Sequence, residues 1–282
     1  STQAKTLFPY TTLFRSLDAL ESKAADIEPS TPAGGEAALN LARFHLGHMQ
    51  SQEALGVLRA AVAARPELEQ DPNFLGMRGA ASYMSGRLKD AENDLSRGTL
   101  RADPSAALWR GMVAAGKGEW DRAIEFFRAA ERQLYLYPSV RGAEFSAVWA
   151  EAALRANDFD AARRQANLAV ANGEREVKER GQLVLANLRA TIDGPAAAWP
   201  ELDRLSKSAV EPVAVRAELR RLELAVPAGK MSANEAAQEL EALRFRWRGD
   251  EVEMATVGIL ADHDGTEASA LLATADAALA RM

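Results

Sequence analysis

The stretch ALWRGMVAAGKGEWDRAIEFFRAA, residues 107–130, contains two helix-forming segments separated by a glycine turn. Gly111 is small enough for two helices to approach closely, and Gly118 predicts the turn between them. Trp120 would close the end of the pair, and Phe127 would fill the space beneath it. The stretch therefore predicts two antiparallel helices in close contact.

The same order of residues recurs along the chain. The second small residue of each pair is Ala54, Ala91, Ala123 or Ala162, so the spacings are 37, 32 and 39 residues. The longer intervals contain insertions, at 67–71 and 135–142. The other three copies are carried by Leu41, Ala42, His45, Ala54, Leu58, Ala61 and Pro66; by Leu75, Gly79, Ser82, Gly86, Leu88, Ala91, Leu95 and Pro104; and by Trp149, Ala150, Ala153, Asn157, Phe159, Ala162, Ala166 and Ala169.

This order of small, turn, aromatic and small residues resembles the tetratricopeptide repeat (TPR) family, whose period is about 34 residues. The resemblance covers residues 36–172 and implies four helix pairs of a degenerate bacterial type. The implied fold is all-α, a right-handed α-solenoid of antiparallel helix pairs. Neighbouring pairs would have to stack, because a single pair cannot bury its apolar face alone.

The rest of the chain is predicted to be helical as well. Apolar residues recur three and four positions apart, and no alternating strand pattern stands out. Residues 17–35 would form an N-terminal helix and a linker, and residues 173–282 would continue the solenoid as diverged pairs. These pairs are 177–192 with 196–206, 213–226 with 232–247, and 251–261 with 266–281. Ser232 followed by Glu235 predicts a capping box.

Residues 1–16 do not follow the helical pattern. The segment LFPYTTLFRS, residues 7–16, resembles the in-frame translation of a widely used short-read sequencing adapter. We therefore expect 1–16 to be an artefactual or disordered arm on a metagenomic fragment whose true N-terminus is missing. The alternative is a genuine aromatic arm. Because a targeting signal would be lost with that terminus, the compartment stays open between cytoplasm and periplasm.

The composition excludes several functions. The 282 residues include 34 Lys and Arg against 40 Asp and Glu, for a net charge of −6. This sign disfavours nucleic acid or an anionic membrane as the main partner. The absence of cysteine excludes disulfides, thiolate metal sites and cysteine nucleophiles. No apolar run is long enough to span a bilayer, so we expect a soluble protein without direct membrane insertion.

Three motifs have both a chemical and a structural interpretation. His45 and His48 lie one helical turn apart, which would suit a metal, but His45 occupies a packing position of the repeat. The turn 262–265, with sequence DHDG, lacks the ligand spacing of a calcium loop and is interpreted as a helix cap. Arginines alternate with aromatic residues in 244–248, a pattern that suits single-stranded nucleic acid. Alternate residues of a helix do not share a face, so we interpret this segment as structural too.

No catalytic signature is present in the sequence. There is no phosphate-binding glycine loop, nucleophile elbow, zinc-binding helix or kinase motif. Carboxylate pairs are frequent, but they are typical of solvated helix faces. We therefore expect no enzymatic activity, no cofactor and no metal.

The TPR resemblance implies a concave groove, lined by the first helix of each pair, that binds a peptide or protein segment. Carried over residue by residue, it places eight residues there: Leu39, Arg43, Tyr83, Met84, Trp109, Met112, Glu151 and Arg155. Trp109 would be the main contact, whereas Trp120 would stabilise its helix pair. One branch of the TPR family binds the C-terminal carboxylate of chaperones with Lys and Asn side chains at set positions. The matching positions in this sequence are Leu39, Arg43, Met77, Ser105 and Trp109, so this carboxylate clamp is absent and a chaperone co-factor role is disfavoured.

The sequence therefore favours a non-catalytic scaffold for protein–protein interaction, with a partner of unknown identity and an open oligomeric state. The alternative is a helical regulatory or envelope and secretion-assembly segment of a larger multidomain protein.

Overall fold

The computed structural model of the chain describes residues 17–137, 139–248 and 252–262. The predicted arm at 1–16, the helix at 266–281 and most of the 262–265 turn lie outside the described residues. All regular structure in the described ranges is helical, which confirms the all-α prediction. The chain divides into two compact units, with the boundary between Asn157 and Asp158. The predicted domain limits stay a prediction.

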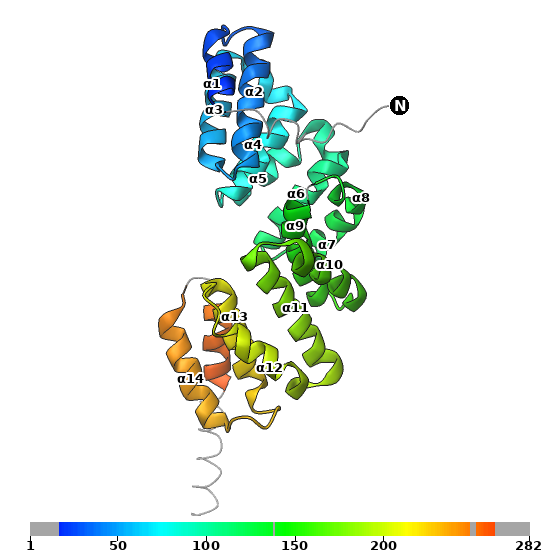
Figure 1. Cartoon of the computed structure of the whole chain (residues 1–282), viewed down its shortest axis with the longest axis vertical. Helices are drawn as coiled ribbons and strands as arrows, with labels where there is room; N and C mark the ends of the chain where they lie inside the picture. The colour runs from blue at the N-terminus through cyan, green and yellow to red at the C-terminus, as the bar shows by residue number, and fades with distance from the viewer. Residues whose placement is uncertain (1–16, 138, 249–251, 263–282) are drawn as a thin grey trace, which may run out of the picture. The chain divides into compact units, whose positions relative to one another are not determined.

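The first unit begins with helix α1, Leu17–Asp26, and continues as successive helix pairs (Figure 1). The pairs are α2 (Pro32–Gly47) with α3 (Ser51–Ala64), α4 (Pro72–Met84) with α5 (Leu88–Leu95), and α6 (Pro104–Gly116) with α7 (Trp120–Ala129). Short 3-10 helices precede the second and third pairs, η2 at Pro66–Gln70 and η3 at Gly98–Ala102. The short helix α8, Glu131–Leu134, and the long helix α9, Ser139–Arg155, complete the unit.

The first helix of each pair starts in the same way. Thr31, Asp71 and Asp103 are the N-cap residues of α2, α4 and α6, and each is followed by proline at the first helical position. The side chain of each cap accepts a hydrogen bond from a backbone N–H of the first turn. Such caps satisfy N–H groups that have no partner within the helix. Helix α2 begins at Pro32, four residues before residue 36, where the first repeat was expected to begin.

The turn that follows the first helix of each predicted pair also recurs. Gly86 and Gly118 have φ angles of 73° and 75°, and the corresponding residues Met49 and Asn157 have 61° and 59°. These four positions are spaced by 37, 32 and 39 residues, like the alanines used to detect the repeat. The left-handed conformation ends the helix and reverses the chain. The repeat is therefore visible in the backbone as well as in the sequence.

Close approach within the pairs confirms the predicted role of the small residues. A Cβ atom added to Gly111 would lie 2.6 Å from the ring of Phe127, and one added to Gly79 would lie 2.6 Å from Leu95 Cγ. In both contacts the two residues are 16 positions apart in the sequence, and Ala123, the small residue predicted on α7, is fully buried. A larger residue at either glycine would therefore overpack the pair.

The second unit is built from consecutive helices in the same manner. They are α10 (Phe159–Asn172), α11 (Arg175–Asp193), α12 (Pro195–Leu205), α13 (Glu211–Ala225) and α14 (Ala233–Arg246), followed by helical residues 252–262. The bounds of α11–α14 agree with the helices predicted at 177–192, 196–206, 213–226 and 232–247, and the capping box at Ser232 and Glu235 is present. The predicted pairing of 251–261 with 266–281 stays a prediction, since the second helix lies outside the described residues. Helix α10 packs against α11 within this unit.

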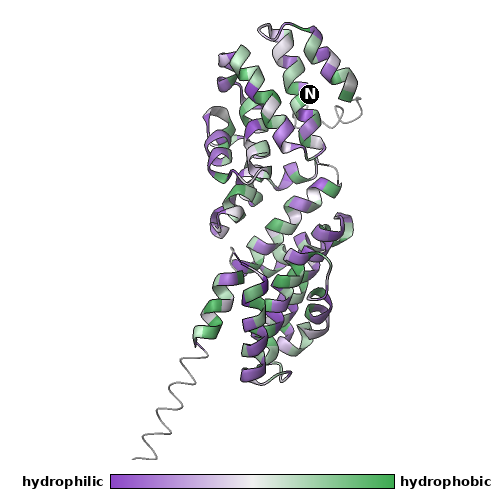
Figure 2. Ribbon diagram, turned by 90° about the vertical axis from the view of Figure 1, so that its left-hand side faces the viewer, coloured by the Kyte–Doolittle hydropathy of each residue, from purple (hydrophilic) through white to green (hydrophobic). Residues whose placement is uncertain are grey.

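Apolar and polar residues are interspersed along the helices of both units (Figure 2). This amphipathic pattern allows each helix to bury one side against its neighbours. None of the helices in the described part of the chain is both long and apolar enough to cross a membrane.

Candidate functional site

An aromatic cluster joins the first helices of the pairs in the first unit. The ring of Trp109 on α6 lies 6.0 Å from that of Tyr83 on α4 and 5.2 Å from that of Phe145 on α9. Trp109 Nε1 donates a hydrogen bond to the hydroxyl oxygen of Tyr137 at 3.3 Å. Burial raises the pKa of the Tyr137 hydroxyl well above its usual range, so this group stays protonated. The cluster joins helices α4, α6 and α9 to Tyr137.

Trp109 is half-buried in this cluster. It therefore has a structural role besides any contact with a partner. We expect Trp109→Ala to lower the free energy of unfolding. The sequence predicted that this substitution would reduce only the affinity for a partner. These contacts of Trp109 could not be predicted from its own helix pair, because Tyr137 and Phe145 belong to a later insertion and helix.

Met112 does not meet the expectation of partial exposure. Only 7% of Met112 is exposed, and Leu39 on α2 is similarly buried at 8%. Helix α6 contacts α4, α5, α7, α8 and α9, so most of its circumference is covered. The prediction that Met112 faces an accessible surface is therefore wrong. Tyr83 and Met84 are half-buried and pack against the core of the first two pairs.

Arg155 and Glu151 lie on the C-terminal half of α9. The Arg155 guanidinium is placed over the ring of Trp120, 4.4 Å from its centroid. Phe145, which contacts Trp109, is ten residues earlier on the same helix, about 15 Å along its axis. The structure therefore brings Arg155 to Trp120 and not to Trp109.

Arg43 on α2 is a half-buried cation that forms no ion pair with a carboxylate among the described residues. Its Nη1 donates to Asn40 Oδ1 at 2.9 Å, whereas its Nε is buried and has no hydrogen-bond partner in the part of the chain that the structure describes. Burial lowers the pKa of Arg43, and the more distant charges of Asp71 and Glu36 act in the opposite direction. Unpaired buried guanidinium groups are uncommon, because they lose hydration without compensation.

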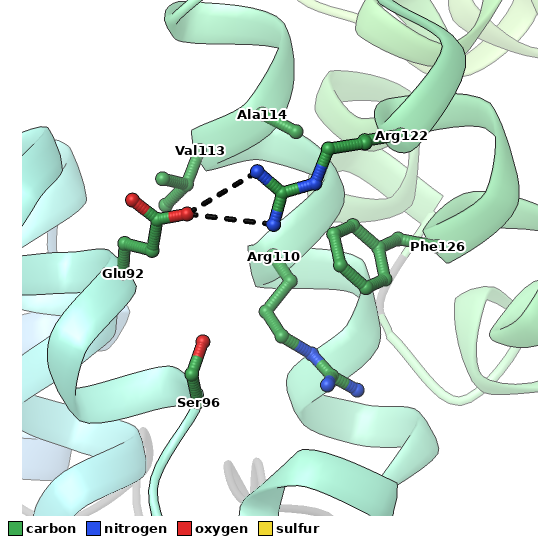
Figure 3. A pocket seen from close by; sticks show the side chains of 7 residues that line it. All are labelled: Glu92, Ser96, Arg110, Val113, Ala114, Arg122 and Phe126. Carbon is green, nitrogen blue, oxygen red and sulfur yellow. Dashed lines mark hydrogen bonds and ion pairs between the residues drawn. The ribbon is translucent and has the colours of Figure 1, made fainter. Parts of the chain in front are cut away.

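A small hollow between α5, α6 and α7 was not predicted from the sequence. Arg110 lies in it with its guanidinium 4.9 Å from the centroid of the Phe126 ring, and its Nη1 donates to the Arg101 carbonyl oxygen at 2.5 Å. Burial lowers the pKa of Arg110, and its Nε is buried with no hydrogen-bond partner from residues 17–137, 139–248 or 252–262. The hollow is lined by Glu92, Ser96, Arg110, Val113, Ala114, Arg122 and Phe126 (Figure 3).

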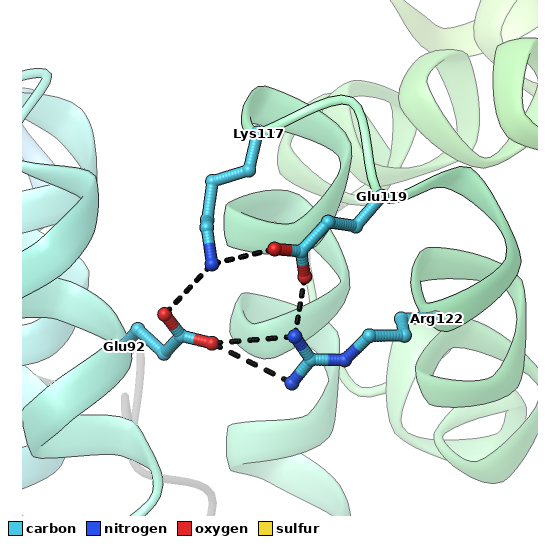
Figure 4. Close-up of polar contacts among 4 residues, drawn as sticks. All are labelled: Glu92, Lys117, Glu119 and Arg122. Atoms are coloured by element: carbon cyan, nitrogen blue, oxygen red, sulfur yellow. Dashed lines mark hydrogen bonds and ion pairs between the residues drawn. The ribbon is translucent and has the colours of Figure 1, made fainter.

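A network of four charged side chains lies beside this hollow (Figure 4). Lys117 forms ion pairs with Glu92 at 2.9 Å and Glu119 at 2.6 Å, and Arg122 pairs with both carboxylates. Hydrogen bonds to Glu119 and Glu92 raise the pKa of Lys117, and the bond from Lys117 lowers the pKa of Glu119. The side chains are partly exposed, so the network links the second and third pairs without contributing much stability.

The remaining candidate motifs have structural partners. His45 is buried with its Nδ1 2.8 Å from Gln50 Oε1, and His48 Nδ1 lies 2.9 Å from the Phe44 carbonyl oxygen. Arg244 and Arg246 pair with Glu241 and Glu218. In the ranges that the structure describes, no group of three or more His, Cys, Asp or Glu residues could hold a metal ion.

No family model matches the chain, and no curated protein matches it either. It is similar in fold to a solved tetratricopeptide repeat protein from Parabacteroides merdae. The two share 17% sequence identity with a TM-score of 0.47, over 88% of this chain and 92% of the other. The evidence for a helix-pair repeat in this chain is its own recurring caps, left-handed turns and close glycine contacts.

Proposed function

We propose that the protein is a non-catalytic scaffold that binds a protein or peptide segment on the first helices of its N-terminal pairs, α2, α4 and α6. Arg43 is the observation that carries this proposal. It stays protonated at every physiological pH, and its Nε has no partner within the described residues. Arg43 is only partly buried, so a carboxylate of a bound segment would pair with the terminal nitrogens of its guanidinium and offset the cost of burying the cation.

The neighbouring helices offer apolar contact to such a segment. Tyr83 and Met84 on α4 and Trp109 on α6 are half-buried, so part of each side chain is accessible. Aromatic side chains provide a large rigid contact area, and methionine adapts to irregular shapes. An extended or helical segment with one carboxylate and several apolar side chains fits this combination.

The proposal is tested by selecting peptides that bind the purified protein and measuring their affinity for variants by calorimetry. Arg43→Gln should weaken binding about tenfold or more, because it removes the charge from the pair with the ligand carboxylate. Arg59→Gln is the matched control, since Arg59 is an exposed arginine on α3. Equal affinity of both variants and the wild type would contradict the assignment of Arg43 to the binding site.

A further inference from the structure

Helix α9 begins one turn earlier than the repeat predicts. The repeat spacing is 39 residues at this point, so Pro104, the first residue of α6, corresponds to Ala143. Helix α9 nevertheless begins at Ser139. Residues 139–142 are therefore an additional turn at the N-terminal end of α9.

One side chain of this additional turn reaches the first helix pair. Arg141 Nη2 donates a hydrogen bond to the Gly47 carbonyl oxygen at 3.3 Å, and its Nη1 donates to Glu144 Oε1 at 2.6 Å. In the ranges that the structure describes, no backbone N–H donates to the Gly47 oxygen, because this carbonyl lies in the last turn of α2. Arg141 thus supplies a partner that the end of α2 lacks, and a cation is favourable at a helix C-terminus.

This contact joins the two ends of the row of first helices. Helix α2 packs against α4, α4 against α6, and α6 against α9, whereas Arg141 connects α9 back to α2. Phe145, one turn after Arg141, contacts the ring of Trp109, which in turn contacts Tyr83. The four first helices therefore form a closed ring of contacts, which includes two of the side chains proposed above to contact the ligand.

The Arg141 contact is the weakest member of this ring. The other members are contacts between packed helices, and Phe145 is only 3% exposed, whereas 30% of the Arg141 side chain is exposed. A single hydrogen bond from a water-accessible side chain contributes little net free energy, because water replaces it when it breaks. The ring can therefore open at Arg141 while every helix pair stays packed.

We propose that Arg141 is a latch that controls the access of a bound segment to the face formed by α2, α4 and α6. When the latch is closed, α9 and α2 are held together, which limits access to Tyr83 and Trp109. When it is open, α2 moves away from α9 and the face becomes accessible. This inference rests on the proposed function, since it concerns the same face, but it assigns a role to Arg141 and none to Arg43.

The first test measures the latch in the absence of a ligand. The chain has no cysteine, so spin labels can be attached through Gln52→Cys on α3 and Ser139→Cys on α9, both at exposed positions. Arg141→Ala should lengthen or broaden the distance distribution between the labels in double electron–electron resonance. Arg132→Ala, which removes an exposed arginine of α8, is the matched control and should leave the distribution unchanged. Identical distributions for Arg141→Ala and the wild type would overturn the proposal.

The second test measures the affinity of the peptides selected on the wild-type protein. The apparent Kd of a ligand falls as the fraction of the binding-competent state rises, so Arg141→Ala should lower the Kd by at least about threefold, through faster association. Arg132→Ala should leave the Kd unchanged. An unchanged or higher Kd for Arg141→Ala, with peptides that still require Arg43, would overturn the latch and leave the proposed function intact. If no peptide binds the wild type or Arg141→Ala, the proposed function fails and the latch fails with it.

Discussion

At the scale of single residues, Gly111 decides how closely α6 and α7 pack. Gly111→Ala should lower the free energy of unfolding by about 1–3 kcal/mol, because the new methyl group would overlap the Phe127 ring. Urea denaturation followed by circular dichroism measures this difference.

Gly56 provides the control for Gly111→Ala. It lies in the middle of α3, and a Cβ atom added there would meet nothing within 4 Å. Gly56→Ala should raise the free energy of unfolding by about 0.5–1 kcal/mol, since alanine loses less conformational entropy in a helix. If both substitutions lowered the free energy of unfolding by similar amounts, the loss at Gly111 could not be attributed to overlap with the Phe127 ring.

Met49 gives a second prediction at this scale. Met49→Gly should raise the free energy of unfolding by about 0.5–1 kcal/mol, because glycine adopts the left-handed conformation without strain. Gly118→Met is the reverse change at the corresponding turn and should lower stability. The same urea titrations measure both. A less stable Met49→Gly protein would mean that the methionine side chain contributes packing at this turn.

The residues that the sequence predicted correctly are those whose role depends on local pattern. Gly111, Ala123 and Gly118 could be assigned because small size and left-handed turns are properties of one helix pair. Met112 and Arg155 could not be placed correctly, because their surroundings depend on how successive pairs rotate against each other. The sequence carries no local signal of that rotation.

At the scale of elements, α4 and α5 are joined by a largely buried ion pair. Arg78 Nε and Nη2 donate to the two carboxylate oxygens of Asp94, each at 2.7 Å, and the Asp94 side chain is only 7% exposed. Asp94→Asn should lower the free energy of unfolding by about 3 kcal/mol, because the guanidinium would lose its buried counter-charge and keep only its longer, exposed pair with Glu69 at 3.4 Å. Urea titration measures the loss.

Asp90 on the same helix is the control for Asp94. Its pair with Arg87 is about half exposed on both sides, so Asp90→Asn should change stability by less than about 1 kcal/mol. If the two variants were equally stable, the buried pair would not be what joins α4 to α5.

The start of α14 makes stability depend on pH. The backbone N–H and the hydroxyl of Ser232 both donate to Glu235 at 2.8 Å, and they lower the pKa of that carboxyl below its usual 4.5. Because the pKa is lower in the folded state, this cap is fully stabilising above pH 4.5 and is lost as the pH falls through the folded pKa. Ser232→Ala should raise the pKa of Glu235 toward its usual value. Carboxyl carbon chemical shifts in a pH titration measure it, and an unchanged pKa would contradict the role of the hydroxyl.

Helix ends were predictable from sequence where the capping residues are local, as at Ser232. The 3-10 helix η3 was not predicted, since Gly98–Ala102 has no apolar periodicity that distinguishes it from a turn. The insertion at 135–142 was recognised, but the contact of Tyr137 with Trp109 was not. That contact joins residues 28 positions apart on different elements.

At the scale of the whole molecule, stability should be local. In a repeat protein each helix pair contacts mainly its neighbours, so a substitution destabilises its own surroundings first. Asp94→Asn should therefore speed amide hydrogen exchange in α4–α7 by up to about a hundredfold, in keeping with a loss of about 3 kcal/mol. Exchange in α11–α13, which belong to the other compact unit, should be unchanged.

Gly181 on α11 provides the reciprocal substitution. A Cβ atom added there would lie 2.8 Å from the Ala166 carbonyl oxygen of α10, so Gly181→Ala should force these two helices apart. Mass spectrometry should then detect faster exchange in α10 and α11, with α4–α7 unaffected. If either substitution accelerated exchange equally along the whole chain, the two units would unfold as one cooperative body. The nearest-neighbour account of this protein would then fail, because a contact within one helix pair would be controlling the stability of helices that it does not touch.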